Sequence, residues 1–374
     1  MAIDKKVLNV PHLRFPEFTE RWDTYRIADI LCIGNGRDYK HLSKGDIPVF
    51  GTGGYMTSVN ECLYEGETTF IGRKGTINKP FYYNGKFWTV DTLFYTHSFK
   101  RVIPKFVYCL FQTINWLRYN EASGVPSLSK DTIEKIKVRI PQLDEQKKIA
   151  KLLSLLDERI ATQNKIIEDL KKLKSAISKQ AFAQKPNGWN RLDTLFSKGK
   201  AGGTPTSTNK EYYNGEIPFL SINDITKQGK YVRYTENHLS RSGLENSSAW
   251  VVPEYSLIIS MYASVGLVTI NEVPITTSQA MFAMQLRDKD LLDYLYYYLS
   301  YFKYRHIHKY LETGTQSNIN ADIVRGIMIP TYGHSRNMKI ASTLQGIDAK
   351  IDNELSVLKL FNRQKNYLLS QMFI

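Results

Sequence analysis

Cysteine is scarce in this chain of 374 residues. Its three cysteines, Cys32, Cys62 and Cys109, are far apart and show no Cys-x-x-Cys spacing. Neither a disulfide framework nor a zinc ribbon is therefore supported. Long hydrophobic runs are also missing, because none approaches the ~18 residues of a transmembrane helix. The opening MAIDKKVLNV lacks the apolar core of a signal peptide. We expect a cytoplasmic protein with no membrane partner.

Enzyme signatures are missing as well. The motifs GxxxxGK[ST], HExxH, GxSxG and the Asn-Pro-Pro-Tyr type of adenine methyltransferases do not occur. The run GTGG at 51–54 lacks the glycine spacing of a nucleotide-binding loop, which favours a turn. Glu145 and Lys147 have the ExK ending of a nuclease motif, but they open a predicted helix. His306 and His308 would point to different faces of a helix. The sequence thus predicts no catalytic residue, no metal site and no cofactor bound by this chain.

Proline is missing from residues 142–185 and 335–374, so each segment can form one helix of about 40 residues, roughly 60 Å long. The segments are copies, since nine of 35 positions are identical when residues 148–182 are aligned with 339–373. Apolar side chains recur in both at the spacing of coiled-coil helices. They form one stripe in each copy: Ile149, Leu153, Leu156, Ile160, Ile167, Leu170 and Ile177, then Ile340, Leu344, Ile347, Ile351, Leu358, Phe361 and Leu368.

Helices of this length need a partner for their apolar stripe. Each copy offers the other a surface of matching shape, which predicts an intramolecular coiled coil. The alternative is that each helix lies alone on one of two globular domains.

The globular parts also repeat. GDIPVF at 45–50 recurs as GEIPFL at 215–220, and SGVPSLSKDTIEKIKVRIP before the first helix recurs as TGTQSNINADIVRGIMIP before the second. The offset between matching motifs grows along the chain. We therefore expect about 20 extra residues in the second part, around residues 226–250.

Both globular parts have an α/β (α+β) pattern. Short strand-like runs such as IPVF, TTFIG, SLIIS and LVTI alternate with Gly, Asn and Pro turns, and helices are expected at about 104–119 and 290–311. The predicted fold is a pseudo-symmetric tandem repeat with these boundaries: first domain 1–141, first long helix 142–185, second domain 186–334, and second long helix 335–374.

Charge points to a polyanionic partner, because 50 Lys and Arg outnumber 36 Asp and Glu and give a net charge of +14. Basic and polar side chains in the loops are candidates for contacts to DNA phosphates and base edges. Solvated hairpin tips and helix capping are the alternatives for individual residues. The candidate DNA-binding residues are Arg37, Lys40, Arg73, Lys74, Lys79, Lys86, Ser127, Lys198, Lys200, Thr204, Thr206, Lys210, Asn223, Lys227, Tyr262, Gln279, Gln316, Ser317 and Asn318.

Several motifs together resemble the specificity subunits of type I restriction-modification systems. They cover nearly the whole chain: PHLRFPEFTERW, GDIPVF and GEIPFL, IGRKGTI, ITTSQAMFAM and GTQSNINADIVRGIMIP. The most specific motif is IPQLDEQKKIAKLLSLLDERI, which recurs in altered form near the C-terminus. The sequence departs from the family pattern before the second long helix, where HSRNMK replaces the usual Pro-x-x-Glu-Gln. We expect this departure to alter local contacts and not the fold.

The resemblance implies two target recognition domains, each reading one half of a bipartite double-stranded DNA target, held apart by two antiparallel helices. It further implies a subunit without an active site. Two methyltransferase subunits would methylate adenine using S-adenosylmethionine. Two restriction subunits would add translocation and cleavage that depend on ATP and magnesium.

Two other functions remain open from the residues. An autonomous DNA modification enzyme is disfavoured by the missing motifs. A coiled-coil adaptor without DNA would explain the helices, but not the charge or the two divergent domains. The repeat also suggests that one half of the chain could form a symmetric dimer that reads a palindrome.

Overall fold

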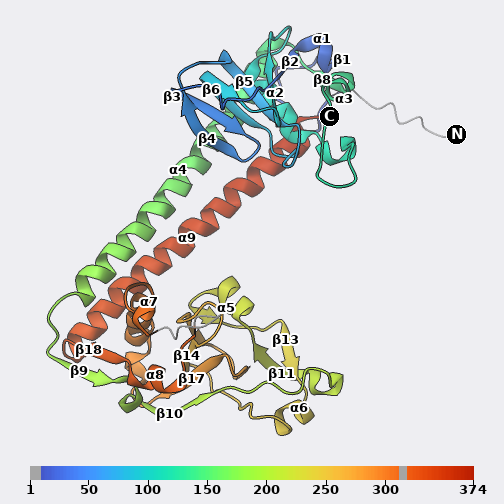
Figure 1. The fold of residues 1–374 in the computed structure, drawn as a ribbon. Coiled ribbons are helices and arrows are strands. Elements are labelled where there is room, and N and C mark those ends of the chain that lie inside the picture. The colour runs from blue at the N-terminus through green and yellow to red at the C-terminus, as the bar shows by residue number, and fades with distance from the viewer. Residues whose placement is uncertain (1–9, 311–317) are drawn as a thin grey trace. The chain divides into compact units, whose positions relative to one another are not determined.

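A computed structural model describes residues 10–310 and 318–374. The chain forms two compact units, the first comprising the described residues up to Lys165 with Ser356–Ile374, the second Ile166–Leu355. Each unit contains one globular domain and one half of each long helix. These helices are α4 (Leu143–Phe182) and α9 (His334–Met372), drawn as two unbroken ribbons in Figure 1. No helix in the described residues combines the length and apolar character needed to cross a bilayer.

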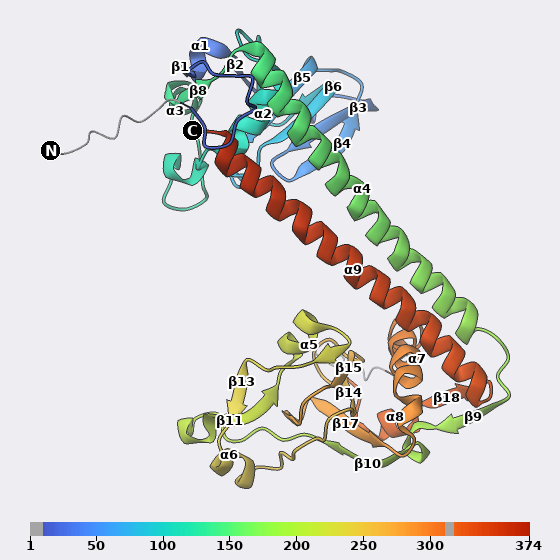
Figure 2. The same cartoon turned by 180° about the vertical axis from the view of Figure 1, so that it is seen from behind.

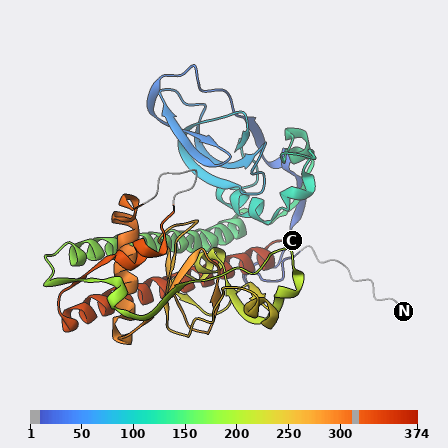
Figure 3. The ribbon, with the colours of Figure 1, turned by 60° about the horizontal axis from the view of Figure 1, so that its bottom comes forward.

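Domain 1 is built on a six-stranded sheet, seen as the blue and cyan strands of Figure 3. One face is covered by α2 (Pro104–Thr113), which buries Phe106 and Phe111. A separate two-stranded ladder joins β1 (Asp23–Arg26) to β8 (Lys137–Ile140) and leads into α4. The order of the large sheet is β2 (Cys32–Asn35), β7 (Leu93–His97), β5 (Tyr64–Gly72), β6 (Phe81–Thr89), β3 (Lys44–Gly51), β4 (Gly54–Val59). Short helices are α1 (Ile27–Ile30), η1 (Trp116–Tyr119) and α3 (Lys130–Lys135).

Domain 2 repeats this plan with a divided sheet. Its ladder joins β9 (Gly188–Arg191) to β18 (Met328–Thr331) and leads into α9. Figure 2 shows α7 (Leu292–Arg305) and α8 (Ala321–Gly326) on one side of the central strands and α5 (Ile222–Gln228) with α6 (Arg241–Glu245) on the other. The divided sheet consists of a five-stranded and a three-stranded part. The strand order of the five-stranded part is β10 (Phe196–Ala201), β17 (Met281–Leu286), β14 (Leu257–Ser260), β15 (Val268–Asn271), β12 (Tyr231–Val232). The strand order of the three-stranded part is β13 (Asn237–Leu239), β11 (Tyr213–Leu220), β16 (Thr276–Thr277).

The helices expected at 104–119 and 290–311 are shorter in the structure. In domain 1, α2 ends at Thr113, and the buried indole of Trp116 donates to the carbonyl of Phe111 at 2.8 Å, which holds the chain in a separate turn. In domain 2, η4 (Lys289–Leu291) precedes α7, and η5 (Ile307–Lys309) follows it after His306. Residue 311 lies outside the described residues.

The segment around 226–250, where we expect extra residues, contains the end of α5, followed by β12, β13 and α6. Of these, β13 pairs with β11 as β4 pairs with β3 in domain 1, so the extra elements before β13 are α5 and β12. They cover a sheet face, because Ile225 of α5 and Val232 of β12 are buried there against Leu220 and Ile258. The registers of the paired strands match between the domains, so Phe50 of domain 1 corresponds to Leu220 and Phe70 corresponds to Ile258. Domain 1 has no counterpart of α5 and β12 between β3 and β4, and it fills the same face with aromatic rings: Phe50, Tyr64, Phe70, Phe81, Tyr83, Phe87 and Tyr95.

Ion pairs join the long helices within each unit. In the first unit, Lys365 Nζ of α9 lies 2.5 Å from Asp157 Oδ1 of α4. In the second unit, Lys174 Nζ of α4 lies 2.5 Å from Asp348 Oδ1 of α9. These four residues are among the nine identities of the repeat, so the same pair is made twice with the helices exchanged. In both units the helices run antiparallel, and no residue of the predicted stripe is exposed.

A tyrosine supports each ion pair. The Tyr297 hydroxyl donates to Asp348 Oδ2 at 2.8 Å, and Lys365 Nζ lies 5.6 Å from the ring of Tyr108. Burial raises the pKa of both phenols, which keeps them neutral beside the carboxylates. The polar side chains that recur in both copies thus fix the register of the helix pair, which the apolar stripe alone leaves less specified.

Each long helix ends in the core of a domain. Phe373 follows α9 and stacks on Phe106 at 5.4 Å between ring centroids. Its equivalent Phe182 ends α4 and meets Tyr298 edge-on at 5.3 Å. Because large aromatic contacts contribute strongly to packing, these two rings anchor the helix ends to the domains.

Candidate nucleic-acid interface

Four segments of domain 1 meet at one end of its sheet. The backbone N–H of Arg37 donates to Thr89 at 2.8 Å, and that of Arg73 donates to Thr92 at 2.8 Å. Leu128 N–H donates to the carbonyl of Arg73 at 2.9 Å, which brings in the segment before α3. Together they define the domain 1 loop edge, whose side chains are Arg37, Arg73, Lys74, Asp91 and Ser127.

Domain 2 forms the same junction with different residues. Gly203 N–H donates to Thr277 at 2.9 Å, Met261 N–H donates to Ala280 at 2.7 Å, and Ile319 N–H donates to Met261 at 3.0 Å. A Cβ on Gly202 would lie 2.0 Å from the carbonyl oxygen of Thr277, so only glycine allows this approach. The domain 2 loop edge carries the side chains of Thr204, Tyr262, Gln279 and Asn318.

The matching hydrogen bonds establish which positions correspond. Arg37 corresponds to Gly203 and Thr92 to Ala280, so Asp91 corresponds to Gln279. Leu128 corresponds to Ile319, which places Ser127 opposite Asn318 in the repeat. The residues that follow, Ser129 and Asn320, both cap the next helix by accepting a backbone N–H. Two different sets of side chains therefore occupy one repeated framework.

The two loop edges differ in charge. Domain 1 presents three cations and Asp91, all exposed, whereas Thr204, Tyr262, Gln279 and Asn318 of domain 2 are uncharged. Arg73 Nη1 donates to the carbonyl of Asp91 at 3.3 Å, and its guanidinium lies 5.9 Å from the ring of Phe94. In domain 2, the Thr204 hydroxyl donates to Gln279 Oε1. Arg and Lys side chains can bind phosphates or the acceptor atoms of guanine. Amide and hydroxyl side chains can form hydrogen bonds with base edges.

Eight of the candidate DNA-binding residues meet at the two loop edges: Arg37, Arg73, Lys74 and Ser127, with Thr204, Tyr262, Gln279 and Asn318. Their contact with DNA remains a prediction. Gln316 and Ser317 lie outside the described residues. Sequence reasoning missed Asp91, because no motif marks it and only the paired hydrogen bonds identify it as the counterpart of Gln279.

The remaining candidates lie elsewhere, several of them with protein partners. Lys86 faces Glu65 at 3.9 Å on the sheet, and Lys198 Nζ lies 4.3 Å from the ring of Trp250. Lys200 Nζ donates to Ser248 at 3.4 Å. Asn223 and Lys227 of domain 2 both bind the carboxylate of Glu236, and this hydrogen bonding lowers the pKa of Glu236. The others, Lys40, Lys79, Thr206 and Lys210, are exposed.

The start of α4 is held by two buried polar side chains. Glu145 accepts two hydrogen bonds from Arg14, both 2.7 Å long, and this contact raises the pKa of the guanidinium. Gln146 accepts from Ile103 N–H at 3.0 Å and donates to Pro141 at 2.8 Å. The helix start is thus tied to domain 1.

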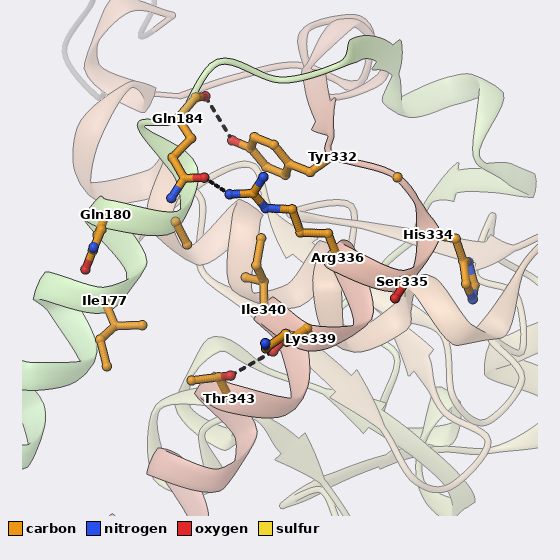
Figure 4. A pocket seen from close by; sticks show the side chains of 12 residues that line it. Ile177, Gln180, Gln184, Tyr332, His334, Ser335, Arg336, Lys339, Ile340 and Thr343 are labelled. Carbon is orange, nitrogen blue, oxygen red and sulfur yellow. Dashed lines mark hydrogen bonds between the residues drawn. The ribbon is translucent and has the colours of Figure 1, made fainter.

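The start of α9 replaces this pair with Arg336 and Asn337. Asn337 Oδ1 accepts from the backbone N–H of Tyr332 at 3.0 Å, so it binds the turn just before the helix, whereas Gln146 also reaches Ile103. Arg336 binds the side chain of Gln184 (Figure 4). Its guanidinium lies 5.6 Å from the centre of the Tyr332 ring. The departure at HSRNMK therefore changes the local contacts while the helix still begins at His334.

A pocket of about 860 Å³ lies beside this start, in the second unit. It is lined by residues of α4 and α9, by Gln184 and by the turn at Tyr332 and Gly333, and by none of the domain 2 loop edge (Figure 4). Across residues 10–310 and 318–374, no group of three or more His, Cys, Asp or Glu could hold a metal ion.

Comparison with known proteins extends over both repeats. Residues 19–172 and 186–359 each match the family described as type I restriction modification DNA specificity domain. The putative type I restriction enzyme MjaX specificity subunit of Methanocaldococcus jannaschii is 27% identical, over 90% of this chain and 89% of the relative. The HindI specificity subunit of Haemophilus influenzae is 32% identical over 30% of this chain.

Some relatives match over a smaller share of their length. The chain spans 40% of the MjaIX specificity subunit of Methanocaldococcus jannaschii and 24% of the HindI subunit. Among solved structures, the type I restriction-modification S subunit from M. genitalium has a TM-score of 0.66 at 14% identity, covering 98% of this chain and 99% of that one. At this identity the likeness shows the fold. The two family matches, one in each repeat, show that the chain belongs to the family of type I restriction-modification DNA specificity domains.

Proposed function

We propose that this chain is the non-catalytic DNA-specificity subunit of a type I restriction-modification complex in the cytoplasm. Each domain reads one half of a bipartite target in double-stranded DNA, and an unspecified gap separates the halves. The observation that carries this proposal is the repeated loop edge, in which one backbone framework holds Arg37, Arg73 and Lys74 in domain 1 and Thr204 and Gln279 in domain 2. Different side chains on equal frameworks suit two different half-sites.

Affinity and specificity would come from different groups. The net charge of +14 favours association with the phosphate backbone in a sequence-independent and salt-dependent way. Base edges would be read by side chains of the loop edges, whose backbone is held by hydrogen bonds between segments that are far apart in the sequence. The antiparallel helices would set the gap between the half-sites.

The catalytic steps would belong to partners. We propose two methyltransferase subunits that use S-adenosylmethionine to methylate adenine, and two restriction subunits that use ATP and magnesium. This chain would recognise the DNA sequence and would bind no cofactor itself.

A footprint with the methyltransferase partner tests the proposal. The complex should protect two short DNA segments separated by an unprotected or sequence-independent gap, and raising the salt should remove the protection. Methyl transfer by the purified chain alone would instead support an autonomous enzyme. Absence of any DNA protection at low salt would favour an adaptor that does not bind DNA.

A further inference from the structure

Gln279 has an unusual position on the domain 2 loop edge. Its side chain is exposed at the turn between β16 and β17, where a base could approach it. The Thr204 hydroxyl comes from the segment after β10 and binds Gln279 Oε1. An exposed glutamine would otherwise sample many rotamers, so this hydrogen bond selects one orientation of the amide before DNA arrives.

The hydrogen-bond capacity of this amide still matches adenine. Gln279 Oε1 can accept two hydrogen bonds, and Thr204 supplies one of them. The second acceptor position and the Nε2 donors remain to pair with the N6 amino group and N7 of adenine in the major groove. Guanine presents acceptors at both places, so it would meet the Gln279 oxygen with an unfavourable contact.

The corresponding position in domain 1 has different chemistry. Asp91 replaces Gln279, and Arg73 contacts it through its backbone carbonyl. A carboxylate only accepts hydrogen bonds and cannot donate to N7 of adenine. The position therefore differs between two domains that share one framework, as expected for a position that distinguishes two half-sites.

We propose that Gln279 reads an adenine in the half-site of domain 2 and that Thr204 is its positioning residue. The inference rests on the proposed function, in which domain 2 reads one half of the target. The base concerned differs from the methylated adenine, because a methyltransferase extrudes its target base from the stack.

The experiment compares the methylated motif of variants by methylome sequencing. The full chain is expressed with its methyltransferase partner in a host lacking other adenine methylation, as wild type, Gln279→Ala, Gln279→Glu, Thr204→Val and Thr204→Ser. Thr208→Val is the matched control, because Thr208 is exposed on the same loop and has no part in the site. Thermal unfolding of each purified complex shows which variants fold.

Gln279→Ala should lose the preference for adenine at one non-methylated position, by about 5- to 150-fold, while the other half-site and the gap stay unchanged. Gln279→Glu keeps the size and the Thr204 contact but lacks the Nε2 donors, so it should lose the same preference. Thr204→Val should weaken the preference at that same position, and Thr204→Ser, which restores the hydroxyl, should regain it. Thr208→Val should keep the wild-type motif.

An unchanged motif in folded Gln279→Ala and Gln279→Glu would overturn the inference, as would relaxation in the half-site that domain 1 reads. A Thr204→Val variant with the full wild-type preference would remove the positioning role. If the wild-type chain directs no bipartite methylation, the proposed function itself fails, so the two failures can be told apart.

Discussion

Lengthening the two long helices should lengthen the unspecified gap in the DNA target. The perturbation is a matched insertion of four residues, between Asn164 and Lys165 in α4 and between Leu355 and Ser356 in α9, which are equivalent positions of the repeat. Asp157–Lys365 lies on one side of these positions and Lys174–Asp348 on the other. A matched insertion therefore keeps both ion pairs, whereas an insertion in α4 alone moves one pair out of register.

The size of the effect follows from helix geometry. Four residues add about 6 Å along a helix, and at 3.4 Å per base pair this corresponds to one or two base pairs of DNA. A matched insertion of seven residues adds about 10 Å, or roughly three base pairs, and nearly preserves the phase of the apolar stripe. The gap should increase with each insertion while both half-sites keep their bases.

Methylome sequencing of cells that express each variant with the methyltransferase partner gives the gap directly. The control is the four-residue insertion in α4 alone, which should unfold at a lower temperature than the matched variant because it separates Lys174 from Asp348. Methylation by the matched variants at the original gap, with wild-type efficiency, would refute the idea that helix length sets the spacing.

Three further predictions concern the ion pairs, the repeat and the charge. Asp157→Lys should lower the free energy of unfolding by about 1–3 kcal/mol, because it leaves Lys365, which is only 12% exposed, beside a like charge. The double variant Asp157→Lys with Lys365→Asp should recover most of this stability in urea titrations. Equal stability of the wild type and both variants would contradict the structural role of the pair. Residues 1–184 alone should dimerise, because Asp157 of each copy can pair with Lys174 of the other. With the methyltransferase partner, this dimer should methylate a palindromic site. A fragment that sediments as a monomer and directs methylation only at asymmetric sites would argue against this. Replacing Arg73 or Lys74 with Ala should reduce the slope of log K against log salt by about 0.9 if the side chain contacts a phosphate, and an unchanged slope for both would exclude phosphate contacts there.

The long helices could be predicted from the sequence because their signal is strong and local. Both lack proline and carry an apolar stripe, and the observed bounds, Leu143–Phe182 and His334–Met372, lie within three residues of the expected ones. The sequence also revealed the nine identities. It did not reveal why Asp157 and Lys174 recur, because their partners lie 208 and 174 positions away along the chain.

Tertiary contacts decided what the sequence left open. Trp22 and Trp189 occupy matching places before the two domains, but Trp22 is 2% exposed and Trp189 is 54% exposed. Trp22 donates its indole N–H to Glu145 at 3.4 Å, and the equivalent of Glu145 is Arg336, which has no acceptor. The different burial of the two tryptophans is thus accompanied by a change from Glu145 to Arg336, which lies 147 positions from Trp189. No local sequence pattern predicts this difference.

The candidate site was predicted only in part for the same reason. Loop composition and charge suggested many DNA contacts, but composition does not show which loops meet. Backbone hydrogen bonds between strands far apart in sequence assembled the two loop edges, and they left Lys86, Asn223 and Lys227 with protein partners elsewhere.

Methylome sequencing of a host that expresses the unaltered chain with its methyltransferase partner tests the central claim most directly. We predict adenine methylation at a bipartite motif, with two different half-sites separated by a gap of fixed length and free sequence. Methylation at one continuous motif, or no sequence-specific methylation by a complex that assembles, would contradict the account.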